Sequence, residues 1–167
     1  MQITLATPDH AAAVVAVRVA AADRLTRDFG NGHWSSHTND AAVLRDMKAS
    51  TVLVARDRGQ IVGTLTLQTK RPWAIDPACF TPCKKALYLI NMAVTPGRQR
   101  SGIGRALLAE ALVAARAFPA DALRLDAYDG PPGGGECYRR CGYTAAGGKS
   151  YRGVPLLYFE LMTGVRP

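Results

Sequence analysis

Apolar side chains recur along the first part of this chain with the period of a helix. From residue 8 to about residue 27 they return every three or four positions, at Val14, Val17, Ala21 and Leu25, which predicts an amphipathic helix. Thr7 and Pro8 suit the N-cap and the first helical position. A second, shorter helix is predicted from Asn39 or Asp40 to about Ala49, after a loop broken by Gly30 and Gly32.

The pattern then changes to that of strands. Residues 52–56 and 61–69 are rich in β-branched and apolar side chains, and the turn-forming tetrapeptide 57–60 between them predicts a β-hairpin. Residues 86–94 are apolar except at Asn91, as in a buried central strand. The remaining predicted elements are a helix at 103–118, a strand at 123–128, a helix at 136–140, and strands at 149–152 and 154–162.

Together these elements predict an α/β fold with a mixed sheet, in which helices come first, then a hairpin, then a strand–loop–helix–strand core. With 167 residues, 48% of them hydrophobic and 20% charged, the composition is that of a globular protein and excludes a disordered one. Neither an internal repeat nor a domain boundary is visible. We therefore expect a single domain over residues 1–167.

The most informative segment joins the strand at 86–94 to the helix at 103–118. The N-terminus of a helix presents unpaired N–H groups and the positive end of a dipole, which together bind anions such as phosphate. Gly102 and Gly104 let a phosphate approach closely, and Arg98, Arg100 and Arg105 add positive charge. A nucleotide-binding P-loop is excluded because no Gly-Lys-Ser/Thr follows the turn. The dinucleotide-binding pattern Gly-x-Gly-x-x-Gly is not matched either, because the position of its third glycine is occupied by Leu107.

The turn resembles that of the GCN5-related N-acetyltransferase (GNAT) superfamily. Residues 99–104, Gln-Arg-Ser-Gly-Ile-Gly, match the family's Gln/Arg-x-x-Gly-x-Gly/Ala motif. Residues 138–143, Tyr-Arg-Arg-Cys-Gly-Tyr, look like the family's Tyr-x-x-x-Gly-Phe/Tyr. The order of elements is similar from about Ile3 to Met162. The resemblance implies a single-domain fold with a mixed, mostly antiparallel central sheet flanked by helices, and an enzyme that moves the acetyl group of acetyl-CoA directly to a primary amine.

The resemblance also implies roles for individual residues. The backbone of the strand before the turn would hold the pantetheine arm and acetyl group, and the turn would hold the pyrophosphate. Tyr138 would be the general acid that protonates the departing thiolate. Many relatives have a glutamate as general base at positions that are Ile90 and Asn91 here, and neither side chain accepts a proton at neutral pH. The expected cofactor-binding residues are Met92, Ala93, Val94, Gln99, Arg100, Ser101, Gly102, Ile103, Gly104 and Arg105.

On the acceptor side, the family places the amine against the first two helices and their connecting loop. His33 and Trp34 in that loop, together with Asn91, are therefore the candidate substrate residues. Asn91 would orient a water molecule or hydrogen-bond the acceptor directly, and Trp34 would either shape a pocket or fill the core beneath the loop. We expect a small-molecule or peptide amine as the acceptor, and a homodimer is compatible with the apolar last strand.

Charge and cysteine content bear on the expected partners, location and metal content of the protein. The net charge of +8 suits polyanionic partners in general, but the arginines are scattered and form no recognised nucleic-acid motif, so we expect no nucleic-acid partner. The first ten residues lack a basic targeting region, and we predict a cytoplasmic protein without membrane association. The pairs Cys79/Cys83 and Cys137/Cys141 are interpreted as reduced packing thiols, with no metal. A non-catalytic acyl-CoA-binding or regulatory module is the alternative to an enzyme.

Overall fold

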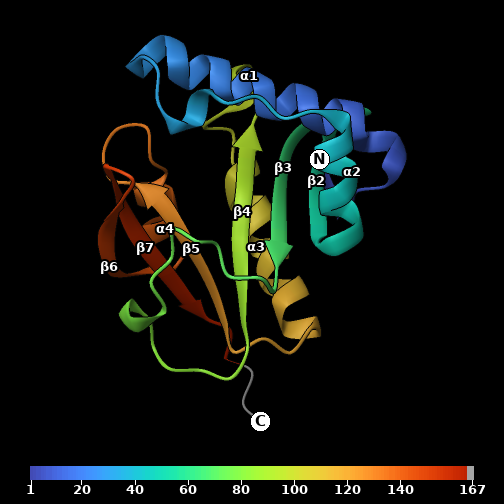
Figure 1. The fold of residues 1–167 in the computed structure, drawn as a ribbon. Coiled ribbons are helices and arrows are strands. Elements are labelled where there is room, and N and C mark those ends of the chain that lie inside the picture. The colour runs from blue at the N-terminus through green and yellow to red at the C-terminus, as the bar shows by residue number, and fades with distance from the viewer. Residues whose placement is uncertain (165–167) are drawn as a thin grey trace. The chain divides into compact units, whose positions relative to one another are not determined.

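The computed structural model describes residues 1–164, which divide into two compact units. Unit 1 comprises Met1–Leu67 and Ile90–Glu110, and unit 2 comprises Gln68–Leu89 and Ala111–Pro167. The hydrogen-bonded strand order is β1-β2-β3-β4-β5-β7-β6. The elements are β1 (Gln2–Leu5), α1 (Ala11–Phe29), α2 (Asp40–Ala49), β2 (Thr51–Asp57), β3 (Gln60–Gln68), β4 (Ala86–Val94), α3 (Ile103–Ala117), β5 (Ala122–Tyr128), α4 (Gly135–Arg140), β6 (Thr144–Tyr151) and β7 (Val154–Met162) (Figure 1).

Unit 1 contains the predicted hairpin and the first two helices. Strand β2 pairs antiparallel with both β1 and β3, and the helices α1 and α2 pack against each other in this unit (Figure 1). The apolar stripe of α1 contributes Val14 to a buried cluster with Val43 of α2 and Val54 of β2. The helical period of the sequence thus becomes a helix face that is buried against strands.

Unit 2 is built on an antiparallel arrangement of the last strands. Strand β7 pairs antiparallel with both β5 and β6, and the beginning of β4 pairs parallel with β5, from Ala86↔Ala122 to Tyr88↔Arg124. Its core contains Phe80 and Tyr158, whose rings stack with centroids 5.5 Å apart. The buried Tyr158 hydroxyl donates a hydrogen bond to the Ala74 carbonyl over 2.6 Å, so its burial leaves no polar group unsatisfied.

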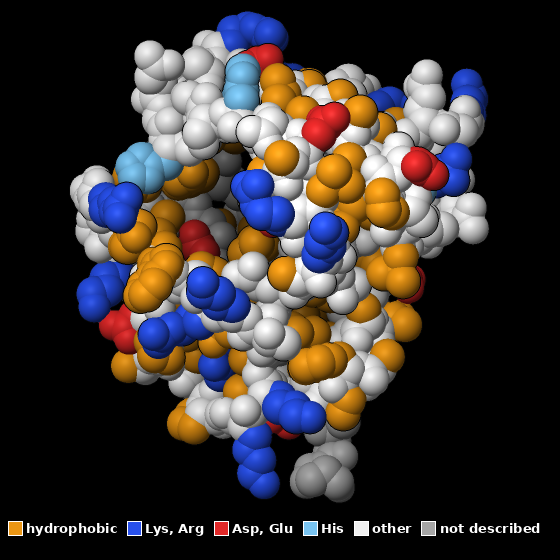
Figure 2. Space-filling model, turned by 45° about the vertical axis from the view of Figure 1, so that its right-hand side comes forward, with side chains coloured by type: hydrophobic (Ala, Val, Ile, Leu, Met, Phe, Trp, Pro, Cys, Tyr) orange, Lys and Arg blue, Asp and Glu red, His pale blue; other side chains and the backbone are white. Residues whose placement is uncertain are grey.

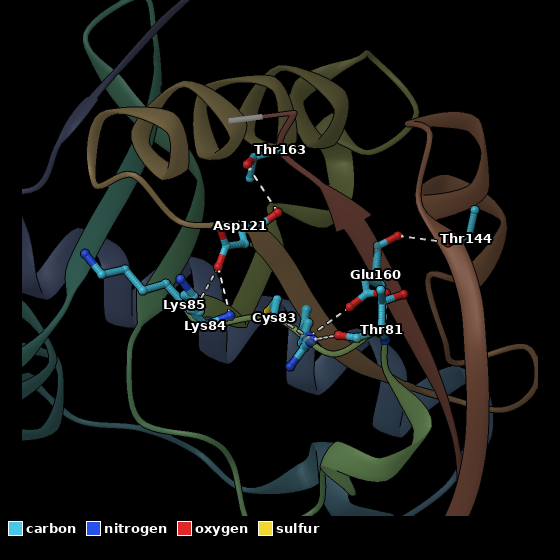
Figure 3. A network of polar contacts seen from close by, with 9 residues as sticks. Thr81, Cys83, Lys84, Lys85, Asp121, Thr144, Glu160 and Thr163 are labelled. Atoms are coloured by element: carbon cyan, nitrogen blue, oxygen red, sulfur yellow. Dashed lines mark hydrogen bonds and ion pairs between the residues drawn. The ribbon is translucent and has the colours of Figure 1, made fainter. Parts of the chain in front are cut away.

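A polar network in unit 2 ties the segment before β4 to the sheet (Figure 3). The Asp121 carboxylate accepts hydrogen bonds from the backbone N–H groups of Lys84 and Lys85 at 3.0 and 2.8 Å. The buried Arg124 donates from Nε to Oε1 of the buried Glu160 over 2.9 Å. Charge-assisted hydrogen bonds of this kind hold an irregular segment in one position.

The predicted α/β fold with a mixed, mostly antiparallel sheet is confirmed, but four details differ from the prediction. The order does not begin with helices, because the short strand β1 precedes them. Residues Pro8–His10 form a separate 3-10 turn, so α1 begins at Ala11. Strand β6 begins at Thr144, earlier than predicted, because pairing with β7 outweighs the low strand propensity of Gly147 and Gly148. In the strand at 86–94, burial is full only over Leu87–Leu89.

Candidate functional site

The turn that precedes α3 joins β4 to the start of this helix through a short irregular segment. Residues Pro96–Arg98 form a 3-10 turn, and then Arg100 and Gly102 both adopt left-handed conformations, with φ of 62° and 86°. The Gly102 carbonyl accepts the first helical hydrogen bond, from Ala106 N–H over 3.0 Å. Helix geometry leaves the N–H groups of residues 103–105 without an intrahelical acceptor. The turn therefore provides a set of donors at the positive end of a 15-residue helix.

Side chains of the turn hold its backbone in place. The Gln99 side-chain amide donates to the Val94 carbonyl over 3.2 Å, and the Ser101 hydroxyl donates to the Arg98 carbonyl over 2.6 Å. These two polar residues of the motif thus organise the loop through side-chain-to-backbone bonds. A Cβ at Gly102 would meet no other atom within 4 Å, so this glycine is needed for its backbone conformation and leaves open space beside the helix end.

The charges of the turn are not all available to a ligand. Arg98 forms an ion pair with Asp57 at the end of β2, and this hydrogen bond holds the pKa of the Asp57 carboxyl below its usual value, with nearby positive charges adding to the effect. Arg98 is thus a connection between the turn and the hairpin more than a phosphate ligand. Arg100 and Arg105 are exposed and remain the candidate cationic contacts.

Two positions that hold the turn were missed by the sequence interpretation. A Cβ at Gly63 of β3 would lie 2.9 Å from Cγ2 of Ile103 and 3.1 Å from Cδ1 of Leu107, so only glycine lets the first turn of α3 approach this strand. Asp57 is the other position, through its bond to Arg98. A glycine inside a strand pattern is a sequence signal of such close approach, whereas nothing in the sequence distinguishes Asp57 from other turn residues.

The second half of β4 carries the predicted pantetheine-binding residues and the candidate acceptor contact. Met92, Ala93 and Val94 are half-buried, and Asn91 is exposed. Asn91 has a φ of 53°, a left-handed conformation that interrupts the extended strand and that asparagine tolerates better than most residues. Such an irregularity inside a strand re-aims the side chain and is typical of functional positions.

Helices α1 and α2 bring charged groups to Asn91 that the sequence interpretation did not connect with it. Nδ2 of Asn91 lies 3.5 Å from Oδ2 of Asp46 on α2. The same oxygen accepts a 2.9 Å hydrogen bond from Nη1 of Arg18 on α1. The three residues are far apart in the sequence, and only the packing of both helices in unit 1 brings them together.

The predicted acceptor loop folds largely on itself. His33 and Trp34 lie in a 3-10 turn, His33–Ser35, three residues after the end of α1. The half-buried indole of Trp34 donates from Nε1 to the Gly30 carbonyl over 3.1 Å. The same ring packs against Gly32, where an added Cβ would lie only 2.6 Å from Cζ2 of the indole. Trp34 therefore shapes its own loop, and His33 is exposed beside it.

Tyr138 lies in unit 2, on the short helix α4. Its ring contacts those of Tyr143 and Phe159, with centroids 5.9 and 5.5 Å away. Burial raises the pKa of the Tyr138 phenol well above its usual value, and the nearby Cys137 and Asp126 add to the shift. Tyr138 therefore keeps its proton at neutral pH, as a proton donor must. Burial also raises the pKa of Asp126.

In the part of the chain that the structure describes, no disulfide joins the four cysteines, of which Cys137 is exposed and the other three are half-buried. On the face shown in Figure 2, lysine and arginine side chains are spread among hydrophobic and neutral ones from one end of the view to the other. Within residues 1–164, no helix combines the length and the apolar character that crossing a bilayer requires.

Known structures share this fold over nearly their whole length. Ribosomal-protein-alanine N-acetyltransferase from Brucella melitensis is 21% identical with a TM-score of 0.72, over 97% of this chain and 99% of that one. The protein yncA from Salmonella typhimurium, solved with its cofactor acetyl-CoA, is 18% identical with a TM-score of 0.76, over 100% and 96%. An aminoglycoside 6'-N-acetyltransferase complexed with coenzyme A is 15% identical with a TM-score of 0.69, over 100% and 99%.

Sequence comparison gives the family directly. A search of curated proteins finds no match to this chain. The model of the acetyltransferase (GNAT) family, however, matches residues 19–143, a range that includes the glycine turn before α3 and Tyr138 on α4. This protein belongs to the acetyltransferase (GNAT) family.

Proposed function

We propose that this protein transfers the acetyl group of acetyl-CoA directly to a primary amine, as one catalytic domain over residues 1–167. The observation that carries the proposal is the turn at 99–104, where two left-handed residues lead into the free N-terminus of α3. That geometry suits a pyrophosphate, which carries the negative charge that a helix N-terminus attracts. Family membership supplies the matching donor, because solved relatives of this fold contain acetyl-CoA or coenzyme A.

In the proposed reaction the amine nitrogen attacks the thioester carbonyl carbon, a C–N bond forms and the C–S bond breaks. The backbone of Met92, Ala93 and Val94 would align the acetyl group with the amine, and alignment of two reactants removes much of the barrier. Tyr138 would give its proton to the departing thiolate. Solvent would take up the proton that the amine loses and return one to the phenol, which balances the step without a covalent enzyme intermediate.

The proposed acceptor class is inferred from proteins that share this fold. Two of the structures that share this fold are named for acetylating an aminoglycoside and a ribosomal protein alanine. We therefore place a small-molecule or peptide amine on the side of His33, Trp34 and Asn91, all of which lie in unit 1 with the turn. Action in the cytoplasm and a homodimeric state are further parts of this proposal.

Calorimetric titration with acetyl-CoA tests the turn. The wild type should bind, and Gly102→Glu should abolish binding because it places a negative charge and a side chain at the helix end. Gly153→Glu is the matched control, since Gly153 has a similar φ of 79° and equally open space in the turn between β6 and β7. Absence of binding in the wild type, or equal losses in both variants, would refute the pyrophosphate site.

Release of free coenzyme A thiol, measured with kanamycin, an alanine-initiated peptide and benzylamine as acceptors, tests catalysis. Tyr138→Phe should lower kcat about 100-fold while the affinity for acetyl-CoA stays within about twofold. Tyr143→Phe is the matched control, because its buried hydroxyl has no hydrogen-bond partner among the described residues. If acetyl-CoA binds but no amine is acetylated, the non-catalytic acyl-CoA-binding module becomes the better description.

A further inference from the structure

The largely buried guanidinium of Arg18, on helix α1, has only part of its hydrogen-bonding capacity satisfied. The Arg18 side chain is 10% exposed. It donates from Nη1 to Oδ2 of Asp46 over 2.9 Å and from Nη2 to Oγ1 of Thr66 over 3.0 Å. Its Nε has no hydrogen-bond partner among the described residues. A buried donor without an acceptor lowers the free energy of unfolding. The incomplete bonding of Arg18 therefore points to a role other than stability.

The carboxylate that Arg18 holds also orients Asn91. Oδ2 of Asp46 lies 2.9 Å from Arg18 and 3.5 Å from Nδ2 of Asn91. A carboxylate only accepts hydrogen bonds, so the NH₂ of the Asn91 amide must face Asp46. The amide oxygen Oδ1 then points away from Asp46. Because Asn91 is exposed and its backbone is left-handed, this oxygen is available to a hydrogen-bond donor from outside the protein.

We propose that Oδ1 of Asn91 receives an N–H of the acceptor amine, and that Asp46, itself held by Arg18, is the positioning residue that turns this oxygen toward the substrate. The inference rests on the proposed function, because Asn91 directly precedes Met92–Val94, the segment assigned to the acetyl group. A primary amine has two hydrogens, so it donates one to Oδ1 while its lone pair stays free to attack. Asn91 takes up no proton, and the proton lost by the amine goes to solvent.

Steady-state kinetics of Asp46→Asn, Asn91→Ala and the double variant test this arrangement, with the amine among kanamycin, the alanine-initiated peptide and benzylamine that the wild type acetylates fastest. Each single variant should lower kcat/KM for that amine about tenfold, the usual effect of losing one hydrogen bond. The calorimetric affinity for acetyl-CoA should stay within about twofold. Because Asp46 acts through Asn91, the double variant should be no slower than Asn91→Ala alone. Asp28→Asn, which removes a surface ion pair with Arg24 on the same helix, should leave all constants unchanged.

Any one of the following results would overturn the inference. The first is a kcat/KM for the amine in Asp46→Asn that stays within twofold of the wild type. The second is a double variant in which the losses of kcat/KM from Asp46→Asn and Asn91→Ala multiply. If Asp46→Asn fails to fold, Asn91→Ala still decides the matter, since its side chain is exposed and an unchanged kcat/KM refutes the contact. Acetylation of none of these amines would overturn the proposed function and this inference together, whereas intact acetylation with unaffected variants would overturn only the inference.

Discussion

The ion pair between Arg124 of β5 and Glu160 of β7 allows a sharp test of what stabilises unit 2. The two side chains are only 7% and 4% exposed and lie opposite each other in the antiparallel register. Arg124 also donates to the Thr81 carbonyl and, over 3.2 Å, to Sγ of Cys83, and its guanidinium lies 4.9 Å from the Phe80 ring centroid. The test compares the single variant Glu160→Met, which removes one charge, with the double variant Glu160→Met and Arg124→Met, which removes both.

Removal of one partner should be costly because the other charge stays buried. Without Glu160, the Arg124 guanidinium loses its only carboxylate among the described residues and remains shielded from water. Such an uncompensated charge costs about 3–5 kcal/mol, and at about 2–4 °C per kcal/mol for a chain of this size the melting temperature should fall by about 6–20 °C. The double variant should lie within about 1 kcal/mol of the wild type, since apolar side chains fill the space and the exposed Thr81 can hydrogen-bond water.

Urea unfolding followed by far-ultraviolet circular dichroism measures these differences. The loss in Glu160→Met should be the same at 0.15 M and 1 M salt, because buried charges are screened much less than exposed ones. Glu136→Gln is the control, as it removes the exposed i,i+4 pair with Arg140 and should change nothing measurable. A loss below about 1 kcal/mol in Glu160→Met, or a double variant as unstable as the sum of both single variants, would refute the reasoning.

Two further predictions concern Gly63, in strand β3 beneath α3, and the half-buried carboxyl of Asp126. Gly63→Ala should lower the free energy of unfolding by about 1–3 kcal/mol and weaken acetyl-CoA binding in calorimetry, because the new Cβ would lie 2.9 Å from Cγ2 of Ile103 at the start of α3. Gly97→Ala is the control, since a Cβ there meets no atom within 4 Å, and it should change neither stability nor binding. Burial raises the pKa of Asp126, so the folded state binds its proton more tightly than the unfolded state and loses stability as pH rises past the unfolded value of about 3.9. Asp126→Asn should therefore melt at a higher temperature than the wild type at pH 7, a gain that disappears below about pH 4, and an equal gain at both pH values would contradict the assignment.

Much of the fold, and the glycine turn before α3, followed from local sequence pattern. A helix or a strand is encoded by the period of its own apolar residues, which is why α1, the β2–β3 hairpin and α3 were predicted within a few residues of their observed bounds. The turn at 99–104 is equally local, because its glycine, its polar side chains and the helix it begins are contiguous. The missed strand β1 has four residues, too few for a period, and forms by pairing with β2.

The features that required the tertiary structure are contacts between distant residues. Arg18 and Asp46 are 28 positions apart, Asp46 and Asn91 are 45 apart, and Arg124 and Glu160 are 36 apart. No periodicity connects such pairs, because each side chain carries only the polarity of its own position. Which charge meets which is decided when strands take their order in the sheet and helices pack on them. The amino-acid sequence by itself therefore determined the elements and the glycine turn before α3, whereas the contacts that link Arg18, Asp46 and Asn91 emerged only from the packing of α1 and α2.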